Sequence, residues 1–139
     1  MSTGFIFDVD GTLWDSVEVV AESWNLAIKE NSDLEPNLNR EILQGLFGKT
    51  MDEIAAGVFP DLDLNSRRKL MDICFDYENR YLETHPGVYY EGVMDTLKEL
   101  ALEYPLFIVS NCQCGYIEVM MKGAGMEPYI KDFLCFGQT

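Results

Sequence analysis

Apolar residues form three short unbroken runs along the chain, and apolar residues at helical spacing fill most of the sequence between them. The runs are residues 4–8, 106–109 and 133–136. An unbroken run of this length, in contrast to an alternating one, is typical of a buried strand in a parallel sheet. We therefore expect three parallel strands, the first of them central and covered on both faces.

The stretch that follows the first run is predicted to be wholly helical from residue 15 to residue 83. Helical spacing predicts helices over 15–31, 38–46 and 66–83, and Thr50 opens a further helix that Pro60 ends. Asp15 and Glu18 have the spacing of an N-cap and its third-position partner, as do Thr50 and Glu53. The inward face of the longest helix is expected to carry Leu70, Ile73, Cys74, Tyr77 and Tyr81.

The pattern changes at His85-Pro86-Gly87. Helices are predicted over 91–103 and 115–122 on either side of the second apolar run, and Gly123 and Gly125 are predicted to end the latter helix in left-handed conformation. Strands that alternate with helices predict a parallel sheet with crossover helices. We expect an α/β core made of residues 1–14 and 84–139, with a helical domain of residues 15–83 inserted into it.

The composition argues against some classes of binding partner. The 139 residues are 47% apolar, which is enough for one domain with a core. Ten basic against 24 acidic residues give a net charge of −14, and this argues against nucleic acid or a membrane surface as partner, since both require a cationic face. The sequence shows neither a membrane-spanning run nor the pattern of a signal peptide, so we expect a cytoplasmic protein.

The cysteines give no sign of a zinc site. Cys74, Cys112, Cys114 and Cys135 lack CxxC spacing, and the chain has one histidine. We expect reduced thiols, with a redox pair formed by Cys112 and Cys114 as the less favoured alternative.

Polar residues follow two of the predicted strands, at the edge where parallel sheets bind ligands. Asp8 and Asp10 follow the first strand, and Ser110 and Asn111 follow the second. One carboxylate can attack phosphorus while a second carboxyl group protonates the leaving oxygen and later activates water. A carboxylate facing a phosphoryl dianion is repelled by roughly 4 kcal/mol for each pair of unit charges at an effective dielectric of ~20. A bound Mg²⁺ would remove most of that repulsion.

These residues carry a resemblance. Asp8-Val9-Asp10-Gly11-Thr12 after an apolar strand, a helical insertion, Pro86-Gly87-Val88 and Val109-Ser110-Asn111 together resemble the haloacid dehalogenase superfamily of phosphohydrolases. The small helical insertion resembles that of the phosphoglycolate phosphatase and β-phosphoglucomutase branch. The resemblance covers nearly the whole chain and implies a Rossmann-like core with a helical cap.

The resemblance also implies roles for single residues. Asp8 would be the nucleophile and a magnesium ligand, and Asp10 the general acid/base, which also contributes its backbone carbonyl to the metal. Ser110 and the Asn111 backbone N–H would bind the phosphoryl group, with Thr12 as a further substrate-binding candidate. A strand-end turn or helix cap is the alternative for Ser110. The dehalogenases and transport ATPases of the superfamily lack an aspartate at the position of Asp10, so this residue favours phosphate esters.

Substrate choice in this branch is attributed to the cap. Lys49, beside a predicted helix start that favours anions, is the candidate contact from the cap, with a plain surface lysine as the equal alternative. Trp14, Phe47 and Met51 could line the closed site, although core packing is the commoner fate of such residues.

The sequence departs from the family pattern at its end. The family has a lysine after the third strand and an acidic pair after a fourth, and neither Lys122 nor Lys131 fits the first of these places. We expect the chain to be the N-terminal part of a longer phosphatase of a small phosphorylated metabolite, with little activity alone and with self-association through an exposed sheet edge. A phosphomutase and a non-catalytic binding or regulatory module remain the alternatives.

Overall fold

The computed structural model describes residues 3–135, which divide into two compact units. The α/β unit is built from the chain up to Asp15 and from Gly87 onward, and the helical unit is Ser16–Pro86. The roles of catalytic core and cap stay predictions at this stage.

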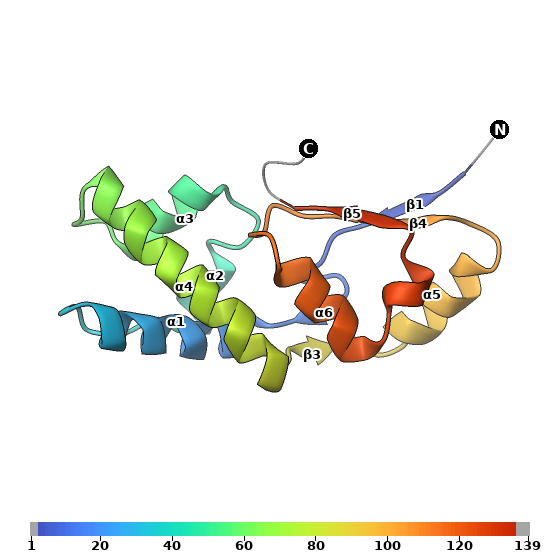
Figure 1. Cartoon of the computed structure of the whole chain (residues 1–139), viewed down its shortest axis with the longest axis horizontal. Helices are drawn as coiled ribbons and strands as arrows, with labels where there is room; N and C mark the ends of the chain where they lie inside the picture. The colour runs from blue at the N-terminus through green and yellow to red at the C-terminus, as the bar shows by residue number, and fades with distance from the viewer. Residues whose placement is uncertain (1–2, 136–139) are drawn as a thin grey trace. The chain divides into compact units, whose positions relative to one another are not determined.

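The α/β unit contains a three-stranded parallel sheet (Figure 1), which confirms the predicted fold class. Its strands are β1 (Phe5–Phe7), β4 (Leu106–Val109) and β5 (Asp132–Leu134), in the order β1-β4-β5. The central strand of the described sheet is thus β4 and not β1. The predicted third strand extends to Phe136, which lies outside the described residues.

Two helices of this unit, α5 (Val93–Ala101) and α6 (Tyr116–Ala124), lie on the same side of the sheet (Figure 1). Buried apolar side chains of the strands and these helices form the core on that side: Leu97, Leu106, Ile108, Ile117 and Met120. A 3₁₀ helix, η1 (Glu127–Tyr129), joins α6 to β5.

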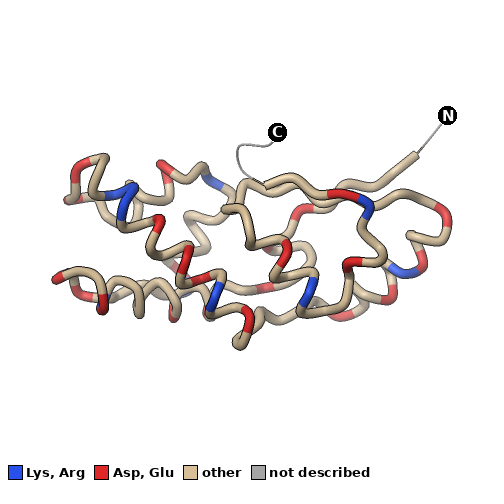
Figure 2. Tube along the Cα trace, viewed as in Figure 1, with Lys and Arg blue, Asp and Glu red and all other residues tan. Residues whose placement is uncertain are grey.

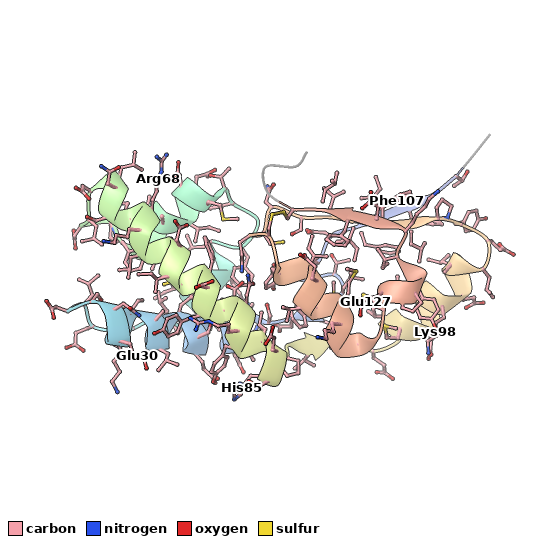
Figure 3. The ribbon with its side chains drawn as sticks, in the orientation of Figure 1. Glu30, Arg68, His85, Lys98, Phe107 and Glu127 are labelled. Carbon is pink, nitrogen blue, oxygen red and sulfur yellow. A yellow bond between two sulfur atoms is a disulfide. The ribbon has the colours of Figure 1, made fainter. Side chains whose placement is uncertain are left out.

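The expectation that β1 is covered on both faces is wrong for the described chain. Ile6 is 72% exposed and Phe5 is 36% exposed. Within residues 3–135, no helix of the α/β unit covers the face opposite α5 and α6 (Figure 1). Phe107 of β4 is on that face (Figure 3), between two buried neighbours. The unbroken apolar run therefore gives this sheet one buried face and one open face.

A short antiparallel pair, missed by the sequence pattern, connects the two passages of the chain through the α/β unit. Strand β2 (Trp14–Asp15) pairs with β3 (Val88–Tyr89), with Trp14 opposite Tyr89. Residue 15 is therefore in a strand rather than in the first helix. Two-residue strands carry too little periodicity to be read from sequence.

The helical unit contains four helices in its described residues: α1 (Val17–Asn31), α2 (Arg40–Gln44), α3 (Met51–Val58) and α4 (Leu64–Thr84). The N-cap of α1 is Ser16 and not Asp15, since Asp15 pairs in β2. Thr50 caps α3 as predicted, because its hydroxyl accepts a hydrogen bond from the Glu53 backbone N–H at 3.3 Å.

The packing of α1 against α4 differs in part from the expected face. Tyr77 and Tyr81 of α4 are only partly buried, and their hydroxyls donate hydrogen bonds to Glu30 and Glu22 of α1. Deeper in the interface, the Trp24 indole donates to the Glu78 carboxylate at 2.8 Å, and both residues are buried. Helical spacing counts a tyrosine as apolar, whereas its hydroxyl needs a polar partner, and this explains why the two side chains lie at the border of the interface and not inside it.

Acidic residues occur on elements of both units and outnumber Lys and Arg in each unit (Figure 2). Among the described residues, none of the helices is long and apolar enough to cross a membrane.

Candidate active site

The register of the parallel strands brings the predicted polar residues to one edge of the sheet. Phe7 of β1 lies opposite Ile108 of β4, so both chains leave the sheet at the same level. Asp8 directly follows the last residue of β1, and Ser110 directly follows the last residue of β4. This is the carboxyl edge, where ligands of parallel sheets bind.

A tight turn follows Asp8 and carries the chain to β2. The Val9 carbonyl accepts hydrogen bonds from the N–H groups of Thr12 and Leu13 at 3.2 and 2.9 Å, and the Gly11 N–H donates to the Trp14 carbonyl at 3.1 Å. Gly11 has φ of +77°, a conformation that a side chain would strain. The turn thus requires glycine at position 11.

The two carboxylates at this edge have different surroundings. Asp8 is exposed, and its Oδ1 accepts a hydrogen bond from the adjacent Val9 N–H at 2.8 Å. Asp10 is partly buried, and its Oδ1 accepts a short hydrogen bond from the Tyr116 hydroxyl. One carboxylate therefore faces outward, while the other is tied to the first turn of α6.

Tyr116 is held in turn by Trp14. The Trp14 indole N–H donates to the Tyr116 hydroxyl at 3.2 Å, and the two rings meet edge to face at 5.8 Å. Trp14 is fully buried and Tyr116 is 2% exposed. The expected core packing of Trp14 is confirmed, and its single polar atom starts a chain of hydrogen bonds that ends on Asp10.

Tyr89 of β3 supports the same cluster from the other side of Trp14. Its ring lies 5.3 Å from that of Trp14, and its hydroxyl donates to the Met120 carbonyl of α6 at 2.6 Å. Burial raises the pKa of Tyr89 to about 12. A Cβ atom added to Gly123 would lie 2.7 Å from the Tyr89 hydroxyl, so a glycine at this point of α6 makes room for the tyrosine.

The segment from the end of β4 to the first residue of α6, residues 110–116, is called the site loop below. The Ser110 N–H donates to the Leu134 carbonyl of β5 at 3.1 Å, and Gly115 before α6 has φ of +99°. A disulfide joins Cys114 of this loop to Cys135, the residue after β5 (Figure 3). The expectation of reduced thiols is therefore wrong for these two cysteines, which sequence spacing could not pair because the sheet brings them together.

The donor set of the described residues suits a magnesium ion only in part. Residues 3–135 contain no group of three or more His, Cys, Asp or Glu side chains that could hold a metal ion. They do offer the Asp8 carboxylate and the neighbouring Asp10. Mg²⁺ takes oxygen ligands and is commonly held by one or two carboxylates together with waters and substrate phosphate, so these residues fit part of its shell.

The remaining predicted site residues fall in two places. Thr12 and Asn111 are exposed in the loops that follow β1 and β4, at the edge that Asp8 occupies. Lys49 belongs to the helical unit, where it is exposed and directly precedes the Thr50 cap. The α/β unit thus carries all of the predicted residues except Lys49.

Sequence reasoning missed Tyr116. Its contact with Asp10 spans 106 residues and depends on how α6 packs beside the turn. The local signal was its place after a glycine at a predicted helix start, and that signal does not distinguish a core tyrosine from one that contacts a candidate catalytic carboxylate.

Comparisons with known proteins identify a family and several proteins with a similar fold. The family model described as "Haloacid dehalogenase-like hydrolase" matches residues 5–138. No curated protein matches the chain. Among solved structures, a predicted phosphoglycolate phosphatase from Haemophilus somnus superposes with a TM-score of 0.85 at 20% identity, over 99% of this chain and 64% of that one.

Two further structures agree. The haloacid dehalogenase-like protein SP0104 from Streptococcus pneumoniae gives a TM-score of 0.76 at 20% identity, over 96% of this chain and 61% of that one. The HAD-hydrolase YfnB from Bacillus subtilis, whose structure was determined bound to magnesium, gives 0.63 at 23% identity, over 96% and 65%. The chain thus spans less than two thirds of each of these proteins. At these identities the structures show a shared fold, whereas the family model matches the sequence itself over residues 5–138. The chain belongs to the haloacid dehalogenase-like hydrolases.

Proposed function

We propose that this chain supplies the nucleophile and the general acid/base of a magnesium-dependent phosphatase that hydrolyses a small phosphate monoester. The observation that carries the proposal is the contrast between the two carboxylates at the carboxyl edge. Asp8 is exposed and accepts only a local backbone hydrogen bond among those described, whereas Asp10 is partly buried against Tyr116. Two acidic groups with different environments are the usual basis for a nucleophile paired with an acid/base.

The chemistry follows from these positions. A carboxylate oxygen of Asp8 attacks phosphorus, the bond from phosphorus to the ester oxygen breaks, and Asp10 gives its proton to the departing alkoxide. A water molecule then attacks the phosphoryl group on Asp8, Asp10 takes the proton of that water, and inorganic phosphate leaves. Tyr116 is proposed to hold the Asp10 carboxyl group in place during these steps, since the Tyr116 hydroxyl donates to Asp10 and accepts from the Trp14 indole.

Asp8 and Asp10 would hold the magnesium ion, which when bound offsets the negative charge of the phosphoryl group. The protein itself carries a net charge of −14, so the cost of bringing in an anion is high without local positive charge. The magnesium-bound structure of YfnB supports this part of the proposal. Ser110 and the Asn111 N–H are the proposed phosphoryl contacts from the site loop.

The helical unit is proposed to be a cap that selects the substrate. Lys49 is its candidate contact with the anionic substrate, because it is exposed beside the first residues of α3. The name of the Haemophilus somnus structure supports a small phosphorylated metabolite as the substrate class. The cytoplasmic location expected from the sequence stays a prediction.

Calorimetric titration of Mg²⁺ and inorganic phosphate tests the proposed site. We expect the parent chain to bind Mg²⁺ with an affinity that phosphate increases. Asp8→Asn should weaken Mg²⁺ binding at least about tenfold, because it removes one charge from the site. Asp95→Asn, which makes the same change on the exposed surface of α5, is the control and should bind as the parent does. Equal binding by Asp8→Asn and the parent would refute the proposal.

A further inference from the structure

The disulfide between Cys114 and Cys135 joins the site loop to the residue that follows β5. Cys135 directly follows Leu134, whose carbonyl accepts the hydrogen bond of the Ser110 N–H. Cys114 lies four residues after Ser110 and two before Tyr116, the residue that holds Asp10. The bond therefore ties the middle of the site loop to the end of β5.

The two cysteines of the disulfide differ in solvent exposure. Cys114 is exposed and Cys135 is 2% exposed. Exposed disulfides are the labile and regulatory ones, whereas structural disulfides resist reduction. An incoming thiolate is therefore expected to attack from the Cys114 side of this bond.

Cys74 forms a contrast to this pair within the same chain. It is buried in the helical unit, and burial, together with the negative charge of Glu78, raises the pKa of its thiol to about 12. Thiol chemistry requires the thiolate, so we expect Cys74 to react slowly in the folded protein. The reactive sulfur chemistry of the chain is thus expected at the sheet edge.

We propose that Cys114 and Cys135 are a reversible thiol–disulfide site that controls the order of the site loop, with low-molecular-weight thiols and disulfides as its reactants. A small thiolate attacks the Cys114 sulfur, the bond to Cys135 breaks, and Cys135 leaves as a thiolate that takes a proton. A second small thiolate attacks the resulting mixed disulfide, which releases the Cys114 thiol and one small disulfide. Two electrons pass from the two small thiols to the protein, and the reverse sequence reoxidises it.

The consequence for the site follows from the connections of the loop. In the oxidised form, the contacts that hold the site loop include the Ser110 N–H hydrogen bond, the disulfide and the Tyr116 hydroxyl. Reduction removes the covalent one of these contacts, so residues 110–116 gain freedom. The inference rests on the proposed function in one respect: loop order matters for activity only if Ser110 and Asp10 serve the phosphoryl group.

The pairing is tested by equilibrating the chain in glutathione buffers of increasing oxidised fraction, followed by acid quenching, denaturation, alkylation and mass spectrometry. Cys114 and Cys135 are expected to lose alkylation together over one transition, while Cys74 and Cys112 stay alkylated. Independent oxidation of Cys114 and Cys135, or protection of Cys112 in place of either, would overturn the proposal.

Loop order is tested by hydrogen exchange of the fully oxidised and fully reduced chain. We expect amides of residues 110–116 to exchange at least about tenfold faster after reduction, through local opening. Cys112→Ser should keep this difference, and the double variant Cys114→Ser with Cys135→Ser should abolish it. Equal exchange in the two forms of the parent would refute loop control.

The same experiment separates this inference from the proposed function. Asp8→Asn should retain the redox-dependent exchange, because no step at the sulfurs involves that carboxylate. A chain whose Mg²⁺ binding is unaffected by Asp8→Asn but whose loop responds to reduction would refute the proposed function alone. A chain with the opposite behaviour would refute the disulfide site alone.

Discussion

At the scale of single residues, the candidate site depends on one tyrosine that connects a buried indole to a carboxylate. Trp14 has a single polar atom, and it is satisfied by Tyr116 inside the core of the α/β unit. Such a buried donor is costly to leave without a partner. The same hydroxyl holds Asp10, so the stability of the unit and the position of the proposed acid/base depend on one contact.

Tyr116→Phe tests this contact. Loss of the hydroxyl leaves the Trp14 N–H buried without its partner, and we expect the free energy of unfolding to fall by about 1–3 kcal/mol. Urea unfolding followed by tryptophan fluorescence measures the change. Tyr104→Phe is the matched control in the same unit and should stay within about 0.5 kcal/mol of the parent. Equal stability of the two variants would show that the Tyr116 hydroxyl is not engaged as described.

At the scale of elements, the sequence allowed the prediction of strands and helices with a periodic pattern. It did not allow the prediction of contacts between residues that are far apart in the chain. The strands β1, β4 and β5 follow from unbroken apolar runs, and the helices follow from helical spacing and from caps such as Thr50. The β2–β3 pair is too short for any period. The Tyr116–Asp10 bond and the Cys114–Cys135 disulfide join residues 106 and 21 positions apart, so they depend on how α6 and β5 pack.

The contact of β3 with α6 predicts an unusual response to a helix-favouring substitution. Alanine is normally more stable than glycine inside a helix, by up to about 1 kcal/mol. Gly123→Ala should nevertheless lower the urea midpoint, because its Cβ would lie 2.7 Å from a tyrosine hydroxyl that is hydrogen-bonded to Met120. In a Tyr89→Phe background the same substitution should raise the midpoint. The absence of this change of sign would contradict the packing described here.

The pKa of Tyr89 predicts how this unit responds to high pH. Its folded pKa of about 12 is above the unfolded value of roughly 10. The contribution of the neutral tyrosine is therefore fully present below pH ~10 and is lost as the pH rises towards 12. We expect the urea midpoint of the parent to fall between pH 10 and 12, and to fall less in Tyr89→Phe. Identical pH profiles for the two proteins would contradict the assignment.

At the scale of the whole molecule, the open face of the sheet is the main unsatisfied feature of the described chain. Ile6 and Leu134, which pair with Phe107 and Val109 of β4, are large apolar residues exposed on this face. The chain spans 61–65% of the length of the three solved structures named above. An exposed apolar strand at a sheet edge invites association with a further chain.

We predict self-association of this chain that increases with protein concentration. Sedimentation velocity should show a larger mass at high concentration, more so at high salt because screening weakens the repulsion of a net charge of −14. Ile6→Lys should shift the chain towards the monomer. Leu102→Lys, at a residue that is 85% exposed after α5, introduces the same charge away from the sheet and should have little effect. A monomer at all concentrations would refute the prediction.

The central claim is that the Asp8 carboxylate accepts a phosphoryl group and that Asp10 is needed to remove it. Mass spectrometry of the chain after incubation with Mg²⁺ and acetyl phosphate tests it most directly, because the acetate leaving group needs no proton from the protein. The Asp10→Asn variant should accumulate one phosphoryl group on Asp8, labile to hydroxylamine, and Asp8→Asn should accumulate none. A phosphoryl group on another residue, or no phosphoryl group on Asp8 in the Asp10→Asn variant, would contradict the account.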